Sequence, residues 1–432
     1  MSGTSLLFIL FQVLAAPQDS PAPVEGLDET TTRGLATQYR KTELWTLKAV
    51  ILTALGRHWH PSGAEIVIDA LNEKDARVRA FALEALRRAD PETLKAAARA
   101  ELMDALVNRQ LKVEHPFFRT RVLEVLKAVA PDAGADLPAS WTRWWSESRA
   151  TWKAGPWTAP RRQESPDGAG PNQTRAESFV ERAFDLNLAG IEAAICIDAT
   201  GSMQPTIDAA RDAVGDMMAV LRGISPRFRL GVVWYRDFDD HKDGADILLP
   251  LTPQLESVHS KLRNLTASGG GDIPERVEKG LEFALSPAMG WQFGTNKIVV
   301  LVGDAPPHPK DVAKAVGLAR KAHEEPFGAG KGGVATGSRD REKPKPRGFI
   351  VSALGVGRIR VAPPAAKALR EIATAGGGTY GEIVGGSAED AVASAGQIVG
   401  HVLAATFGEA WADATGEFVK TYLEYRKNRF FD

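Results

Sequence analysis

Residues 198–203 of the chain read DATGSM and follow an apolar run, IEAAICI, at 191–197. The run has the length and composition of a buried strand, so Asp198, Thr200 and Ser202 would stand directly after its carboxyl end. One carboxylate and two hydroxyls at alternate positions are hard oxygen donors, the kind that Mg²⁺ and Ca²⁺ bind in proteins. These residues are therefore candidates for one edge of a cation site.

Two later segments could complete such a site. A glycine-rich stretch, GGGDIPE at 269–275, carries Asp272. The apolar run KIVVLVG at 297–303 leads directly to Asp304. In a parallel sheet covered by helices, ligands bind beyond the carboxyl ends of the strands. If the strands that end near Asp198 and Asp304 are neighbours, all three segments lie on one rim.

With this order of segments the chain resembles a von Willebrand factor type A domain over residues 190–405. That family has a metal-ion-dependent adhesion site, made of Asp-x-Ser/Thr-x-Ser after the first strand, a residue from a glycine-rich loop and an Asp after the fourth strand. Asp198, Thr200 and Ser202 match the first element, and Asp304 matches the last. The resemblance implies direct coordination by the hydroxyls, coordination largely through water by the carboxylates, and an oxygen donor from a protein partner.

Asp272 departs from the integrin-like version of this site, which has Thr in the glycine-rich loop. A third carboxylate lowers the attraction of the cation for an external acid, which favours a partner with a neutral oxygen, or a structural ion. Asp272 is also placed to cap a helix that starts near Pro274. We expect Mg²⁺, with Ca²⁺ or Mn²⁺ as alternatives, bound by Asp198, Thr200, Ser202, Asp272 and Asp304.

Three enzymatic alternatives fit the sequence less well. Phosphoaspartate hydrolases of the haloacid dehalogenase type need a second Asp where this chain has Thr200. The glycine-rich stretch at 328–333 follows polar residues and no strand, so it lacks the context of a dinucleotide-binding loop. His308 has no Ser or Cys nucleophile motif beside it. The sequence therefore favours a non-catalytic protein, with a magnesium-assisted phosphoester hydrolase that uses Asp198 and Asp272 as the alternative.

From about residue 190 onward, apolar runs alternate with amphipathic stretches. Expected strands lie at 191–197, 229–235, 247–251, 297–303, 349–357 and 379–384. Expected helices lie at 205–222, 256–265, 274–285, 311–324, 364–375, 388–411 and 410–428. Apolar strands separated by helices indicate a doubly wound, mostly parallel α/β sheet covered on both faces. The strand at 247–251 contains Pro250 and is expected at an edge of the sheet.

Two further features concern single segments of this region. Cys196 is the one cysteine of the chain, and its place in an apolar strand predicts a small buried side chain. Residues 235–244, YRDFDDHKDG, are dense in acids and are expected to form a solvated loop on the same rim.

Residues 35–152 have the pattern of an all-α domain. VRAFALEAL at 78–86 and FRTRVLEVL at 118–126 align about 40 residues apart, with Arg79 matching Arg119. Helical segments that recur at this spacing resemble HEAT repeats, in which each helix pair buries its apolar face on its neighbours. A generic helical bundle is the alternative. The tryptophans that follow, within 141–157, are expected either to cap the array or to present a stacking platform.

These patterns divide the chain into segments. We expect a signal peptide at 1–16, a flexible N-terminus at 17–34 and a HEAT-like domain at 35–152. Next come a Pro- and Gly-rich linker at 153–180 and the type A domain at 181–408, which contains a polar insertion at 325–347. A C-terminal helix follows at 409–432. The N-terminal apolar run is too short to span a bilayer, so we expect an exported protein without a transmembrane segment.

The overall charge is nearly balanced, with 53 Lys and Arg against 54 Asp and Glu. This balance gives no general attraction to nucleic acid or to anionic membranes. We therefore expect an exported, non-catalytic protein that captures a protein ligand at the metal site and offers a helical-repeat surface as well.

Overall fold

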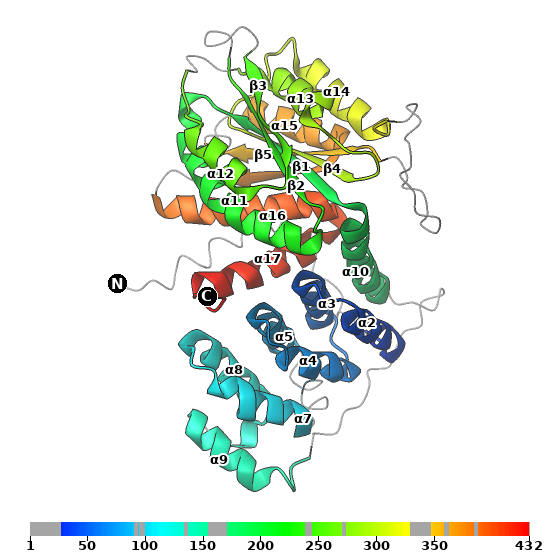
Figure 1. The fold of residues 1–432 in the computed structure, drawn as a ribbon, viewed down its shortest axis with the longest axis vertical. Coiled ribbons are helices and arrows are strands. Elements are labelled where there is room, and N and C mark those ends of the chain that lie inside the picture. Colours follow the sequence, from blue (N-terminus) through cyan, green and yellow to red (C-terminus); the bar gives the residue numbers. More distant parts are fainter. Residues whose placement is uncertain are drawn as a thin grey trace. The chain divides into compact units, whose positions relative to one another are not determined.

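The structure is a computed structural model that describes residues 27–89, 94, 100–133, 137–153, 171–237, 244–269, 274–328, 347–357, 363–383 and 388–431. The chain divides into two compact units (Figure 1). One unit comprises the described residues up to Glu181 together with those from Lys420 onward, and the other runs from Arg182 to Val419. The second unit is therefore inserted between two parts of the first.

The second unit is built on a six-stranded sheet in the order β3-β2-β1-β4-β5-β6. Its strands are β1 (Ile191–Asp198), β2 (Arg229–Tyr235), β3 (Ala245–Thr252), β4 (Asn296–Gly303), β5 (Phe349–Val356) and β6 (Gly377–Ile383). Neighbouring strands are parallel except β2 and β3, which are antiparallel. β3 lies at one edge, as Pro250 predicts, because proline cannot donate a ladder hydrogen bond. The predicted mostly parallel sheet is confirmed.

Helices cover both faces of this sheet (Figure 1). They are α11 (Gln204–Ile224), α12 (Leu255–Asn264), α13 (Val277–Leu285), α14 (Val312–Glu324), α15 (Pro363–Ala375) and α16 (Ala388–Phe407). α11 packs with α12 and α16 on one face, and α14 packs with α13 and α15 on the other. Cys196 of β1 belongs to a core cluster with Leu281 of α13 and Leu369 of α15. Its thiol is fully buried, as predicted.

The segment expected to be flexible at 17–34 contains the start of a helix. α2 (Glu29–Lys41) begins there because Asp28 caps it, accepting a hydrogen bond from the Thr31 amide at 2.7 Å. The buried side chain of Leu35 then anchors the helix in the first unit. The prediction of flexibility was therefore wrong for residues 29–34.

The predicted linker at 153–180 also contains helical residues. α10 (Pro171–Ala189) begins at Pro171, because proline is favoured in the first turn of a helix. The predicted signal peptide at 1–16, residues 154–170 of the linker and residues 329–346 of the insertion lie outside the described residues. In the part of the chain that is described, no helix has the length and apolarity needed to cross a bilayer.

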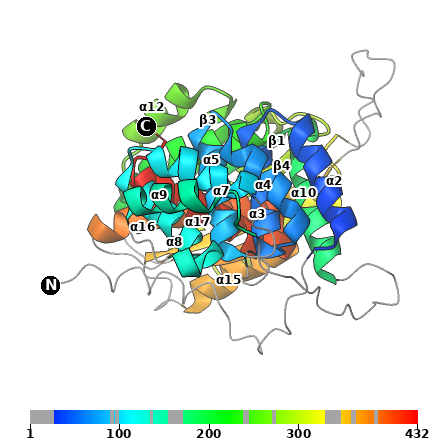
Figure 2. The ribbon, with the colours of Figure 1, turned by 90° about the horizontal axis from the view of Figure 1, so that it is seen from below.

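The first unit is built from helices (Figure 2). They include α3 (Trp45–Arg57), α4 (Ala64–Leu71), α5 (Ala76–Arg88), α7 (Ala100–Met103), α8 (Pro116–Val129) and α9 (Pro138–Ser148). Arg79 and Arg119, which match in sequence, each donate to the main-chain carbonyl six positions earlier, at 2.9 Å and 3.1 Å. The two segments thus share local structure. That they are HEAT repeats stays a prediction.

Two of the clustered tryptophans, Trp141 and Trp145 of α9, are buried. The indole nitrogen of Trp145 donates to Asp104 at 2.8 Å, and Arg149 pairs with the same carboxylate. A stacking platform needs exposed ring faces, so packing is the role that fits these two rings.

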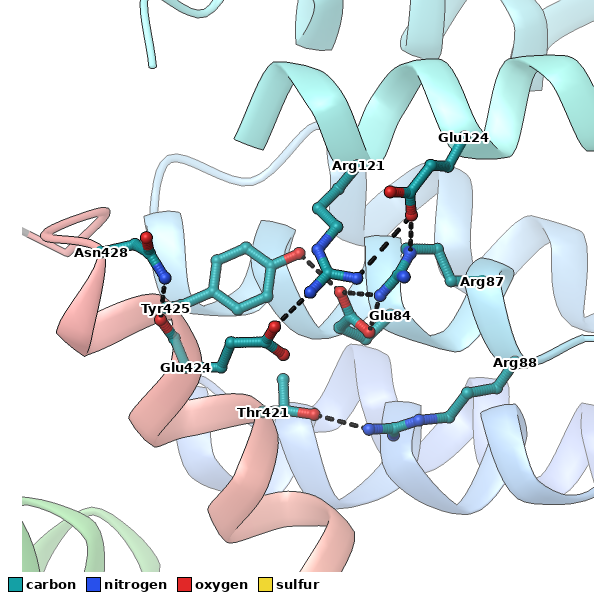
Figure 3. A network of polar contacts seen from close by, with 9 residues as sticks. All are labelled: Glu84, Arg87, Arg88, Arg121, Glu124, Thr421, Glu424, Tyr425 and Asn428. Atoms are coloured by element: carbon teal, nitrogen blue, oxygen red, sulfur yellow. Dashed lines mark hydrogen bonds and ion pairs between the residues drawn. The ribbon is translucent and has the colours of Figure 1, made fainter. Parts of the chain in front are cut away.

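The C-terminal segment of the first unit consists of the last turns of α17 (Ala412–Lys427) and the residues after it (Figure 3). Tyr425 is fully buried, and its hydroxyl donates to Glu84 of α5 at 2.9 Å. Arg121 of α8 pairs with Glu424. Further contacts join Arg88 to Thr421, Trp45 to Tyr422 and Phe118 to Phe430. This segment is therefore an integral part of the helical unit.

Replacing Tyr425 by Phe is expected to lower the free energy of unfolding of this unit by about 1–3 kcal/mol, because the buried Glu84 carboxylate loses a donor. Tyr380→Phe in the second unit is the matched control. The Tyr380 hydroxyl also donates to a carboxylate, Glu382 at 3.0 Å, but both side chains are partly exposed, so the loss should be smaller. Urea titration, with hydrogen exchange in α5 to assign the transition, measures both changes. Equal losses would contradict the role given to Tyr425.

Candidate metal centre

Three strands end together at the carboxyl edge of the sheet. β1 and β4 pair in parallel with Ile197 opposite Val302, so Asp198 and Asp304 follow at neighbouring places. Tyr235, the last residue of β2, lies opposite Asp198. The strands that end near Asp198 and Asp304 are therefore neighbours, so these two predicted segments lie on one rim.

The Asp198 side chain is held by the turn that follows it. Its Oδ1 accepts hydrogen bonds from the Thr200 amide at 2.9 Å and from the Thr200 hydroxyl at 2.7 Å. The carboxylate is fully buried, and Oδ2 has no hydrogen-bond partner among the described residues. A buried oxygen of this kind is costly unless something else satisfies it.

The end of β4 approaches Asp198 closely because residue 303 is Gly. A Cβ at this position would lie 3.6 Å from Asp198 Oδ2 and 2.5 Å from the Tyr235 hydroxyl oxygen. Real Cβ atoms do not approach a heavy atom as closely as the second distance, so a side chain here would displace its neighbours. Gly303 thus allows Asp304 to follow next to the first segment.

The electrostatics of the rim centre on Asp198. The pKa of its carboxyl is raised from 3.8 to about 7, mainly by burial and to a smaller extent by the negative charge of Asp304. The hydrogen bonds from Thr200 and the positive charge of Arg236 lower this pKa but do not offset burial. A bound cation would stabilise the buried Asp198 carboxylate, because it would offset the repulsion from Asp304.

The two hydroxyl residues differ in exposure. Thr200 is 3% exposed, and its hydroxyl proton is engaged by Asp198, which leaves the lone pairs of Oγ1 to face another group. Ser202 is exposed and stands in the short turn Gly201–Met203 that precedes α11.

The glycine-rich loop lies against the first segment. The Gly201 amide donates to the Gly269 carbonyl at 3.1 Å, and the Ser268 amide donates to the Ala199 carbonyl at 3.0 Å. The loop therefore reaches the rim at residues 268–269, although Asp272 itself lies outside the described residues.

The far end of this loop lies against the third segment. The Glu275 amide donates to the Pro306 carbonyl at 2.9 Å, and the helix expected at 274–285 starts only at Val277, with Arg276 at its N-cap. The N-cap of α13 is therefore Arg276, and Asp272, which was also expected to cap this helix, lies outside the described residues. Glu275 forms an isolated parallel bridge with Pro307, three residues after Asp304.

The described members of the predicted set have the chemistry of a site for a hard divalent cation. Asp198 Oδ2 is an orphaned buried oxygen, Thr200 keeps free lone pairs, and Ser202 is open to solvent. Within the described residues, no group of three or more His, Cys, Asp or Glu side chains could hold a metal ion. The predicted set differs from such groups because two of its donors are hydroxyls and Asp272 lies outside the described residues.

Sequence reasoning missed the residues that support the rim. The segment at 235–244 was expected to be solvated, but Tyr235 is fully buried and Arg236 is 9% exposed; residues 238–243 lie outside the described residues. His308, which has no Ser or Cys nucleophile motif beside it in the sequence, contacts Asp237 through Nε2 at 3.0 Å. The one available signal was that this acid-rich segment directly follows a buried strand.

Residues 193–325 match the family described as von Willebrand factor A domain. The matched range contains all five predicted site residues. A protein of Acanthamoeba polyphaga mimivirus, named as an ariadne-like RING finger protein (R811), is 28% identical over 128 residues. That match covers 30% of this chain and 12% of the mimivirus protein, so it spans only a small part of the relative's length.

Several solved structures are similar to about half of the chain. The conserved protein BatB from Bacteroides thetaiotaomicron is 18% identical with a TM-score of 0.33, covering 48% of this chain and 96% of that one. The SpRpn10 VWA domain is 14% identical with a TM-score of 0.34, covering 48% and 95%. The pilus adhesin SpaC from Lactobacillus rhamnosus GG is 12% identical with a TM-score of 0.35, covering 49% and 30%.

Proposed function

We propose that this von Willebrand factor A domain binds a divalent cation, Mg²⁺, at the rim and uses it to capture a protein partner. The cation would supply a positively charged centre with an open position for an oxygen of the partner. The observation that carries the proposal is Asp198, a fully buried carboxylate with one oxygen fixed by Thr200 and the other without a partner among the described residues. A divalent cation is the group that best relieves this arrangement.

Each predicted residue has a role that suits its position. Thr200 and Ser202 would offer neutral hydroxyl oxygens directly. Asp198 and Asp304 would act largely through water, and Asp272 would add a third carboxylate from the glycine-rich loop. Because three carboxylates offset the positive charge, the domain should prefer a partner that offers a neutral oxygen, such as an amide or hydroxyl, over one that offers an acid.

The protein is proposed to be exported and non-catalytic. Hydrolysis at this site would need a base within hydrogen-bond reach of the attacking water, and the sequence places no Ser or Cys nucleophile motif beside His308. Turnover of phosphoesters with Mg²⁺ would instead support the hydrolase alternative. Export is tested by the N-terminal residue of the mature protein, which should lie beyond the apolar run of the first 16 residues and not be Met1.

Capture of a partner is expected to require both Mg²⁺ and the Ser202 hydroxyl. The purified full chain, immobilised in Mg²⁺, should retain a partner from native envelope or secreted material, and EDTA should release it. Ser202→Ala should reduce recovery about tenfold or more, because the change removes one direct oxygen donor to the ion.

Ser260→Ala is the matched control, since Ser260 is an exposed serine on α12 of the same domain. It should capture the partner as the wild type does. Equal recovery from all three proteins, with and without EDTA, would contradict metal-dependent capture.

A further inference from the structure

Three consecutive residues at the end of β2 contact the metal rim without belonging to the predicted ligand set. They are Tyr235, Arg236 and Asp237. Tyr235 is fully buried, Arg236 nearly so, and the Asp237 side chain is 14% exposed. Their contacts, taken in order along the chain, reach each of the three segments that carry predicted ligands.

Tyr235 fastens the first segment and lies against the third. Its carbonyl accepts a hydrogen bond at 2.9 Å from the amide of Ala199, the residue between Asp198 and Thr200. Its hydroxyl donates to the Val302 carbonyl of β4 at 3.4 Å. The first contact fixes the direction in which the chain leaves β1.

Arg236 joins the first segment to the residues that lead into the glycine-rich loop. Its Nε donates to the Ala199 carbonyl at 2.8 Å, and one terminal nitrogen donates to the Thr266 carbonyl at 2.5 Å. The guanidinium also lies over the Trp234 ring, 4.9 Å from its centre. A planar guanidinium can hold two carbonyls of different loops at fixed angles, which a lysine ammonium cannot do.

Asp237 reaches the third segment. Its Oδ1 lies 3.0 Å from Nε2 of His308, four residues after Asp304. The Tyr-Arg-Asp segment therefore contacts all three ligand-bearing regions, which are far apart in the sequence.

We propose that Tyr235-Arg236-Asp237 is a positioning segment that holds the three ligand-bearing loops in place before any cation binds, with Arg236 as its central residue. This inference rests on the proposed function, because the loops that the segment orders are those that would carry the ligands of the ion. Without such a support, the like charges of Asp198 and Asp304 would drive the loops apart in the metal-free protein. Ligands held in place by outer contacts lose less entropy when the ion arrives.

The test is hydrogen exchange of the full-length protein in EDTA, so that it does not depend on metal binding. In Arg236→Gln, the amides of Gly201 and Ser268, which join the two loops, should exchange about tenfold faster or more. Amides in the centre of β1, such as that of Ile195, should change much less and serve as the internal reference for global stability.

Arg182→Gln is the matched control. Arg182 also donates to two main-chain carbonyls, those of Thr406 and Phe407, but it contacts Asn296 at the opposite end of β4. This variant should leave the exchange of Gly201 and Ser268 unchanged relative to β1. Equal effects of the two glutamine variants would show a general stability role and overturn the proposal.

Arg236→Lys separates charge from geometry and remains informative if the glutamine variant does not fold. Lysine keeps the positive charge but lacks the planar fork that places two donors at fixed angles to the two carbonyls, so fast exchange should persist. Wild-type protection in Arg236→Lys would overturn the proposed crosslink.

A Mg²⁺ titration of thermal stability completes the test. Both Arg236 variants should need about tenfold more Mg²⁺ than the wild type for half of the shift. An unchanged requirement would overturn the link between loop order and ion binding. If the wild type itself shows no Mg²⁺ response, the proposed function fails, while the exchange data still decide whether Arg236 orders the loops.

Discussion

In EDTA at pH 8, Asp198→Asn is expected to unfold with a free energy about 1–4 kcal/mol higher than that of the wild type. The wild-type carboxylate is fully buried, and its pKa is raised to about 7, so at pH 8 it is mostly ionised in an unfavourable environment. The asparagine carbonyl oxygen can still accept both hydrogen bonds from Thr200 without carrying a charge.

Saturating Mg²⁺ should reverse this order. An ion that binds only the folded wild type stabilises it by about 4.1 kcal/mol at a thousandfold excess over Kd, which offsets even the largest deficit expected in EDTA, and the asparagine variant should gain little. Urea unfolding with EDTA and with Mg²⁺ measures the four free energies. Asp246→Asn, which removes an exposed carboxylate on β3, is the control and should behave like the wild type in both buffers. The same order of stability in both buffers would contradict a cation at Asp198.

The stability of the metal-free wild type relative to Asp198→Asn should fall as the pH rises. The pKa of Asp198 is about 7 in the folded protein and near 3.8 in the unfolded chain, so between these values the folded state binds more protons. Its stabilising contribution is complete below about pH 4 and is lost progressively as the pH rises to about 7. The difference between these two pKa values corresponds to roughly 4 kcal/mol.

The measurement is the difference in free energy of unfolding between the wild type and Asp198→Asn, in EDTA at intervals from pH 4 to 8. This difference isolates the Asp198 carboxyl because the other titrating residues are common to both proteins. The Mg²⁺ response of the wild type should grow over the same interval, since the ligands must be ionised to hold the ion. A difference that does not vary with pH would show that Asp198 has an ordinary pKa.

Much of the second unit could be predicted from the sequence. Buried parallel strands must be apolar along most of their length, so the runs of β1, β2, β4 and β5 stand out from the amphipathic helices between them, and Pro250 marks the edge strand. The order of those strands was not predicted. It depends on which strands pair, and that pairing places Asp198 beside the end of β4.

Other features depend on tertiary contacts that local composition does not reveal. Residues 235–237 begin an acid-rich stretch, yet they are largely buried because they fill the space between the loops of the rim. From sequence Tyr425 is one aromatic residue of an amphipathic helix, but in the structure it is buried in contact with Phe118 and Glu84, which are far away in the sequence. For Pro171, the missing signal was local: proline is common in linkers and also at the start of a helix.

Crystals of the full chain grown in Mn²⁺, used in place of Mg²⁺ for its anomalous scattering, test the central claim most directly. We expect one anomalous peak at the carboxyl edge of the sheet, within about 2–2.5 Å of the hydroxyl oxygens of Thr200 and Ser202. Asp198 and Asp304 should lie in the next layer of contacts around it. A map without a peak at this place, or with the ion held by other residues, would contradict the account.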